Sequence, residues 1–280
     1  MVEFFEQLSK VAVLVFVVTC MVTAGLGLSV HDIVAPLRRA RLVAAALLAN
    51  FVIAPCIAYA LTELIPLDRS HAIGLLLLGS AAGAPFLPKL AELAHGDKAF
   101  AVGLMLLLMV GSVVFMPIAL PLLVPGLSAE PWPILKPLLL TMLLPLSVGV
   151  FVKSRWTLRA LPLQRVFGIV SNVSMLLAVL LLIGLNFQAM LGTFGTGAVA
   201  VGVAFVSLSL GAGYVLGGPH PTTRSVLGVG TGQRNIAAAL LIATENFRED
   251  PGVTAMLLIS TFAGVVVLVL AARRFAKPVR

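Results

Sequence analysis

Charged residues are scarce in this chain, and their scarcity decides its class. Only 11% of the 280 residues are charged, against 60% that are hydrophobic, and the mean hydropathy is +1.11. Soluble domains carry about 25% charged residues, so this chain lacks the side chains to cover a water-exposed surface. It also lacks the alternating apolar and polar stretches of a membrane β-barrel. The composition predicts an all-α integral membrane protein whose partner is the lipid bilayer.

Motifs of soluble chemistry are absent as well. The two cysteines, Cys20 and Cys56, lie inside apolar runs, where we expect small buried hydrophobic side chains rather than a disulfide. The four histidines lie at the ends of apolar runs without a metalloprotease spacing, and no Gly-Lys-Ser/Thr loop for ATP is present. We therefore expect no enzyme, no metal site and no ATP-driven pump. The net charge of +8 is spread over loops, which argues against a nucleic-acid partner.

Long uncharged runs are what the chain does contain. Runs of about 20 apolar residues match the thickness of a bilayer, and a backbone in lipid satisfies its hydrogen bonds by forming helices. We predict one polytopic domain over 1–280, with a first repeat at about 1–124 and a second at about 132–280. Its nine transmembrane helices are predicted at about 9–30, 41–62, 71–94, 98–124, 132–153, 163–186, 196–217, 222–246 and 252–273.

Basic residues gather in three of the segments between or after these helices. They are Arg38, Arg39 and Arg41, then Lys153, Arg155, Arg159 and Arg165, then Arg273, Arg274, Lys277 and Arg280. Nine alternating helices place all three groups on one side, and lysine and arginine mark the cytoplasmic side. We expect the N-terminus outside and the C-terminus in the cytoplasm, in a prokaryotic inner or plasma membrane. Glu3 and Glu6 precede the first apolar run, unlike the basic start of a cleaved signal peptide, so we expect that helix to be retained.

Two predicted helices contain residues that interrupt a helix. The third holds Pro85 and Pro88 among small residues, and the eighth holds alternating glycines followed by polar side chains. Proline removes a helix hydrogen bond and glycine lowers helix stability, so we predict two helices broken near mid-membrane. Paired interruptions of this kind are typical of the binding site of a secondary transporter. In the eighth helix the glycines are Gly228, Gly230 and Gly232, and the polar residues are Thr231, Gln233, Arg234 and Asn235.

Several stretches of the chain resemble the bile acid/sodium symporter family. They are Gly25-Leu26-Gly27-Leu28-Ser29, Asn50-Phe51 to Pro55, Gly74 to Gly79 leading to Leu93 to Asp97, and Thr231 to Leu240 ahead of Asn246-Phe247. The resemblance covers most of the chain. It implies two inverted repeats of five helices, or nine helices in all when the first is missing, with a panel domain that moves against a core domain. It further implies that the two broken helices are the discontinuous pair that crosses in the core.

The chain departs from this family where the family binds sodium. The first broken helix of the family offers serine and asparagine where this chain has Leu87 and Pro88, and the second often offers glutamate where it has Val229. Only the positions of Asn50 and Gln233 keep a side-chain oxygen. Na⁺ therefore stays possible as a coupling ion, but its ligands are largely missing, and we expect no other cofactor.

Arg234 is the most informative candidate for a binding site. A charge in the middle of a membrane span costs about 2.5–3.5 kcal/mol. We therefore expect Arg234 to face a cavity, to extend its charged group towards the membrane surface, or to pair with an acid such as Glu92. We hypothesise that Arg234, with Lys89 on the partner broken helix, binds an anionic substrate through its charge and through half-helix N-termini.

The polar neighbours of Arg234 have two roles open to them. Thr231, Gln233 and Asn235 either bind a ligand or satisfy the backbone groups that the break frees. Asn50 either forms a hydrogen bond between helices or contacts a ligand. Glu92 either belongs to a solvated charged loop or acts as a proton relay.

These observations predict a secondary active transporter. We expect it to move a small organic anion by alternating access, in the manner of a symporter, with sodium coupling in question. The alternatives are sodium-independent or proton-coupled anion transport, and a family member that no longer transports. The sequence specifies neither the substrate nor the direction of transport, and the oligomeric state is unknown from it.

Overall fold

The computed structural model describes residues 2–29, 39–124, 127, 131–193 and 195–276, and within them it is helical without a strand. The helices of the first half are α1 (Val2–Leu26), α3 (Ala40–Leu48), η2 (Ala49–Ile53), α4 (Ala54–Leu64), α5 (Arg69–Ser80), α6 (Leu87–Leu93) and α7 (Lys98–Leu123). Those of the second half are α8 (Trp132–Leu138), η3 (Leu139–Leu143), α9 (Leu144–Arg155), α10 (Thr157–Leu185), α11 (Phe187–Thr193), α12 (Ala198–Leu216), α13 (Pro221–Gly232), α14 (Ile236–Asn246) and α15 (Pro251–Phe275).

Eight helices in this described part are long and apolar enough to cross a membrane. Two of them, α3 to α4 and α8 to α9, run on through the short π-helical segments η2 and η3. The third helix expected from the sequence is not among the eight, because it is divided into α5 and α6, and each piece is too short to span a bilayer. The eighth expected helix is divided as well, into α13 and α14, but together they form one of the eight spans, Pro221–Asn246. The chain is an integral membrane protein, as its composition predicted.

Helix boundaries differ from the sequence-based expectation at the basic loop before 163–186. The helix α10 begins at Thr157 and contains Arg159 and Arg165, and only Trp156 separates it from α9. Charged residues end the membrane-embedded part of a helix, but arginine and lysine favour helical backbone, so the helix itself continues beyond the apolar run. The short helix α11 was not expected at all.

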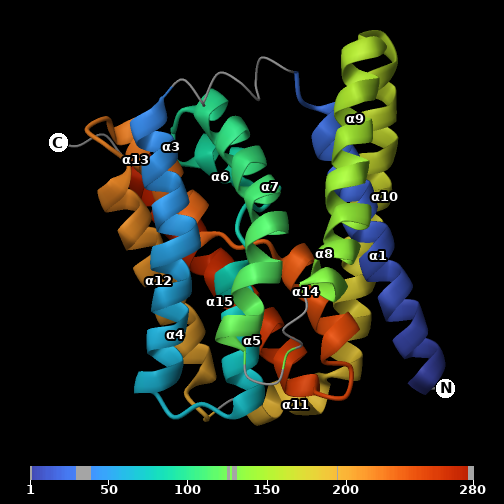
Figure 1. Ribbon diagram of the computed structural model, residues 1–280, viewed down its shortest axis with the longest axis vertical. Helices are drawn as coiled ribbons and strands as arrows, with labels where there is room; N and C mark the ends of the chain where they lie inside the picture. Colours follow the sequence, from blue (N-terminus) through green and yellow to red (C-terminus); the bar gives the residue numbers. More distant parts are fainter. Residues whose placement is uncertain (1, 30–38, 125–126, 128–130, 194, 277–280) are drawn as a thin grey trace.

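The helices form two groups that Figure 1 separates clearly. The helices α1, α9 and α10 pack closely on one another, with α1 in contact with both others, and they lie on the right of the view. The segments α8 and η3 lead into α9 and belong with this first group. The remaining helices pack around α12, α13 and α15 on the left and in the centre. The two groups meet where α7 contacts α8 and η3, and where α1 contacts α14.

The outer surface of this bundle is apolar. Leu122, Val215 and Leu158 are among many large hydrophobic side chains that are exposed. Cys56 is exposed as well, which corrects the expectation that it is buried, while Cys20 is half-buried. An apolar outer surface of this extent is favourable against lipid tails. A small hydrophobic side chain such as Cys56 can therefore lie on this surface as well as in the protein interior.

Candidate functional site

The two interruptions face each other inside the larger helix group. The first covers 81–86 between α5 and α6, and the second covers 233–235 between α13 and α14. The Asn235 backbone N–H donates to Ala81 O at 2.9 Å, and Asn235 Nδ2 donates to Gly83 O at 3.2 Å. We call these two interruptions, joined by these hydrogen bonds, the crossing.

Proline and glycine shape the first interruption. Pro85 lies within it, and Pro88 lies in the first turn of α6. Proline is tolerated there because N–H groups of the first turn have no hydrogen-bond partner within the helix. Gly83 has a φ of +78°, and a β-carbon there would lie 2.3 Å from the Met109 backbone nitrogen of α7. The backbone therefore turns at Gly83 and passes α7 at a distance that only glycine permits.

The glycines of the eighth predicted helix do not form the second interruption, which corrects that expectation. Gly228, Gly230 and Gly232 all lie in α13, and the helix ends only after Gly232. The cost of glycine in a helix is about 1 kcal/mol, which close packing outweighs here. A β-carbon at Gly230 would lie 3.2 Å from Leu87, and one at Gly228 would lie 3.1 Å from Tyr214.

Side chains satisfy the backbone groups that the interruptions free. Asn235 Oδ1 accepts from the Ala238 N–H at 3.2 Å and so caps α14. Ser112 of α7 accepts from the Ala82 N–H at 2.8 Å and donates to Ala82 O at 2.9 Å. Ser112 is not among the site residues expected from the sequence. The sequence feature that could have identified Ser112 is that it carries the one hydroxyl group in the long apolar helix α7.

Arg234 lies at the centre of the crossing and is only 6% exposed. Its Nε donates to Leu78 O at 3.1 Å, and its Nη1 donates to Asn50 Oδ1 at 3.0 Å and to Thr231 O at 3.3 Å. Its Nη2 donates to Asn50 O at 3.4 Å and to Gly79 O. A guanidinium has five N–H groups, so every donor of Arg234 has a protein acceptor.

These acceptors are neutral, and no ion pair of the described residues includes Arg234. Leu78 and Gly79 lie in the last turn of α5, and Thr231 lies in the last turn of α13. The C-terminus of a helix is equivalent to roughly −0.5 charge. Two such ends together offset about one positive charge, so helix dipoles take the place of a carboxylate.

Asn50 reaches Arg234 because of a local departure from α-helical geometry. It lies in η2, where the Ala54 N–H bonds to Ala49 O, a spacing of five residues. With the same spacing the partner of Asn50 O would be Pro55, which has no N–H. The carbonyl of Asn50 is thereby left free for Arg234. Single-turn π segments are frequent at functional sites.

Thr231 and Gln233 complete the polar side chains of the crossing. Thr231 Oγ1 accepts from Asn50 Nδ2 at 3.1 Å, and both side chains are fully buried. Gln233 has an extended backbone, with φ −80° and ψ 124°, and its Oε1 is buried without a hydrogen-bond partner. The structure therefore brings Asn50, Thr231, Arg234 and Asn235 into one hydrogen-bonded network beside Gln233.

Lys89 and Glu92 lie apart from this network. Lys89 is exposed, with its ammonium 5.5 Å from the centre of the Phe86 ring, and Glu92 is exposed and paired with Lys98 at 2.6 Å. Neither has a contact with Arg234 among the described interactions. The acid expected as a structural partner of Arg234 is therefore replaced by backbone carbonyls.

Asp97, in the same charged cluster, joins two helices at this end of the bundle. It caps α7 through the Phe100 N–H at 3.0 Å and pairs with Arg39 at 2.7 Å. Partial burial raises the pKa of Asp97, but these hydrogen bonds and the charge of Arg39 outweigh it and hold the pKa below its usual value. In the part of the chain that the structure covers, no three His, Cys, Asp or Glu residues are grouped to hold a metal ion.

A cleft of about 530 Å³ lies between α7 and the segment formed by η3 and α9. It runs from Val110 and Leu143 towards Gly103 and Ser154, and its lining is apolar apart from Ser147 and Ser154. None of its lining residues is charged. The cleft therefore fits a ligand with a substantial apolar part.

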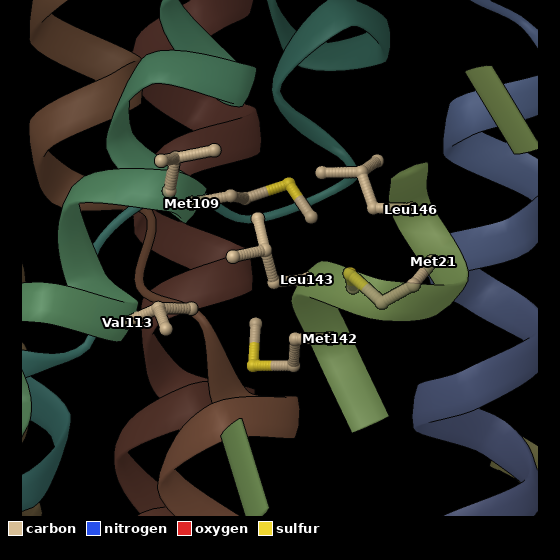
Figure 2. Close-up of a pocket in the computed structure, with 7 residues that line it drawn as sticks. Met21, Met109, Val113, Met142, Leu143 and Leu146 are labelled. Atoms are coloured by element: carbon tan, nitrogen blue, oxygen red, sulfur yellow. The ribbon is translucent and has the colours of Figure 1, made fainter. Parts of the chain in front are cut away.

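A narrow apolar pocket adjoins the cleft and shares the lining residues Val110, Leu143 and Leu146 with it, and we call this pocket the seam. Met21, Met109, Val113 and Met142 come together there with Leu143 and Leu146, as Figure 2 shows. The seam leaves no space for a water molecule. Because Met109 also contacts the position of Gly83, the seam and the crossing lie on two sides of α7.

Comparison with known proteins gives one family match. The sequence profile of the Sodium Bile acid symporter family matches residues 13–193, which is more than half of the chain. The matched part contains α5, α6 and the first interruption, whereas the second interruption lies beyond it. No curated protein matches the chain.

Proposed function

Because the chain belongs to the sodium bile acid symporter family, we propose that it is a secondary transporter that moves an organic anion by alternating access without a requirement for sodium. The observation that carries this proposal is the crossing of two interrupted helices. Discontinuous helices place half-helix ends and free carbonyls at the binding site of a secondary transporter. We assign α1, α8, η3, α9 and α10 to a panel that moves against the other helices, and we keep the two inverted repeats as part of this proposal.

The cleft and the seam support alternating access. The cleft lies between the two helix groups and reaches Ser154, beside the basic residues Lys153 and Arg155 in the last turn of α9. The positive-inside rule makes this the cytoplasmic end, with the N-terminus outside and the membrane a prokaryotic inner membrane. In this proposal the dry seam closes the opposite end. The arrangement corresponds to an inward-facing state in which the seam is the closed barrier.

The charge pattern supports an anion as substrate. The apolar part of the substrate fits the cleft, and Lys153 and Arg155 supply positive charge near its mouth. Arg234 donates no hydrogen bond to the substrate in this proposal, because all of its donors are engaged with the protein. Proton coupling through Glu92 stays an alternative, as does a protein of this family that no longer transports.

Transport into proteoliposomes tests this function. We expect uptake of apolar carboxylates that is unchanged when choline replaces sodium on both sides. Ser147→Trp fills the cleft and should lower the rate of uptake by at least about tenfold. That loss corresponds to an increase of about 1.4 kcal/mol in the activation free energy. Ser207→Trp is the matched control, because Ser207 is also exposed and also bonds to a carbonyl four residues earlier.

Two results would contradict the proposal. Uptake that disappears without sodium would end the claim of sodium independence. Equal uptake by the Ser147→Trp and Ser207→Trp variants would show that the cleft is not the substrate path. A pH gradient that drives uptake, and that fails to do so in Glu92→Gln, would favour the proton-coupled alternative.

A further inference from the structure

We propose that the guanidinium of Arg234 is a built-in cation, held in a site whose oxygens would otherwise bind a monovalent metal ion. This inference deepens the sodium-independent part of the proposed function and rests on it for its role in transport. Its prediction is specific to this chain: removal of the Arg234 side chain creates an alkali-cation site.

The ligand set around Arg234 consists only of oxygens. Leu78 O and Gly79 O come from α5, Thr231 O comes from α13, and Asn50 contributes both its carbonyl and its Oδ1. Backbone carbonyls replace the hydration shell of alkali cations in membrane proteins. Unwound carbonyls and half-helix C-termini hold coupling cations in secondary transporters. The acceptors of Arg234 are of both kinds.

The partial negative charges around the guanidinium balance about one positive charge. The C-termini of α5 and α13 point at the guanidinium, and each is equivalent to roughly −0.5 charge. No carboxylate adds to them among the described ion pairs. A monovalent cation therefore balances the site, whereas an empty site would leave five oxygens facing one another in a buried volume.

Arg234 and a metal ion exclude one another. All five N–H groups of the guanidinium are directed at the same oxygens that an ion would need. The side chain is tethered beside Gln233 and Asn235, so it competes at a very high effective concentration. The wild-type protein should therefore show no specific response to sodium here, and its crossing should hold its structure without a free ion.

This assignment differs from a role for Arg234 as an anion ligand. An anion that accepted hydrogen bonds from the guanidinium would have to displace Leu78 O, Asn50 or the other protein acceptors. Each of those carbonyls would then be buried without a donor, which is costly. The two assignments make opposite predictions for Arg234→Ala, because one predicts a new cation site and the other predicts only the loss of anion binding.

The test is thermal unfolding of the purified full-length protein in detergent. Chloride salts of lithium, sodium, potassium and choline are compared at equal ionic strength, with free guanidinium at low concentration as a further probe. We expect the wild type to respond equally to all salts. Arg234→Ala should unfold at a lower temperature in choline and should be restored, saturably, by at least one alkali cation or by guanidinium.

Three further variants keep the test decisive. Asn50→Ala combined with Arg234→Ala removes one ligand oxygen and should weaken the cation response at least tenfold in concentration. If Arg234→Ala does not fold, Arg234→Lys and Arg234→Gln are compared, because lysine retains a tethered cation and glutamine does not. We expect the lysine variant to retain markedly more folded protein than the glutamine variant.

The proposal is overturned if folded Arg234→Ala responds to every salt as the wild type does. It is also overturned if the lysine and glutamine variants are equally stable. Neither result depends on transport, so they are distinct from a failure of the proposed function. A cation site gained in Arg234→Ala, in a protein that moves no anion, would support the built-in cation and reject the transporter.

Discussion

Asn50 is the residue whose side chain joins the separate parts of the crossing. Its Oδ1 accepts from Arg234, while its Nδ2 donates to Thr231 Oγ1 at 3.1 Å and to Ala46 O at 3.0 Å. The side chain is fully buried. The sequence left open whether Asn50 bonds between helices or contacts a ligand, and the structure places it in contact with both Arg234 and α13.

Loss of the Asn50 side chain should therefore destabilise the protein strongly. Asn50→Ala leaves a buried charged donor short of an acceptor, and we expect a loss of about 2–4 kcal/mol in the free energy of unfolding. The measurement is unfolding of the purified protein in detergent. Asn186→Ala is the control, because the Asn186 amide bonds only to Leu182 O of its own helix, and there we expect at most about 1 kcal/mol. Similar losses in the two variants would contradict a central role for Asn50.

Local sequence and tertiary packing each determine the position of one interruption. Proline at 85 and 88 marked the first interruption, and the structure has it at 81–86. The second was expected among the glycines, but it follows them, because close packing holds Gly228 and Gly230 in helical geometry. The π segments η2 and η3 gave no hydrophobic signal, since a single extra residue per turn leaves an apolar run unchanged.

The first interruption should be intolerant of a side chain at its turn. Gly83→Ala adds a β-carbon 2.3 Å from a backbone nitrogen of α7, at a φ of +78°. Left-handed backbone costs about 1–2 kcal/mol for alanine, and the clash with Met109 adds about 1–3 kcal/mol. We expect a total of about 2–5 kcal/mol, measured as a lower unfolding temperature.

Gly211→Ala is the matched control for Gly83→Ala. Gly211 lies within α12, and a β-carbon there would meet no atom within 4 Å. Alanine favours a helix by about 1 kcal/mol over glycine, so this variant should be as stable as the wild type or slightly more so. A Gly83→Ala protein as stable as Gly211→Ala would contradict the tight passage of the first interruption past α7.

The two helix groups meet through contacts that are mostly apolar. The seam of Met21, Met109 and Met142 joins α1, α7 and η3, and the cleft opens beside it (Figure 2). Methionine side chains are flexible and adapt to changes in packing. An interface of this kind slides at low cost, which is what movement of one group against the other requires.

A covalent link across the seam should stop the movement that the proposed alternating access requires. We would introduce Met109→Cys and Met142→Cys in a protein whose Cys20 and Cys56 are replaced by alanine, and join the thiols with a short bifunctional reagent. Transport in proteoliposomes should fall at least about tenfold and recover on cleavage of the link. Each single variant treated with the same reagent is the control. Full transport with the link confirmed by mass spectrometry would exclude movement at the seam.

The sequence by itself determined the class, most of the membrane-spanning helices and the presence of two interruptions. These follow from composition, from the length of apolar runs and from proline and glycine, which act on the backbone locally. It also identified Arg234, Asn235, Thr231 and Asn50 as candidates, because polar side chains are costly in a membrane. It did not determine their partners, since a buried charge requires compensation without specifying its source.

Only the tertiary structure decided how the charge of Arg234 is balanced. Glu92, the acid expected to pair with Arg234, is exposed, and the acceptors are carbonyls of Leu78, Gly79 and Thr231 together with Asn50. Every residue carries a backbone carbonyl, so a sequence does not reveal which carbonyls are free. They become available where two helices end opposite each other, and that is a property of how the chain folds.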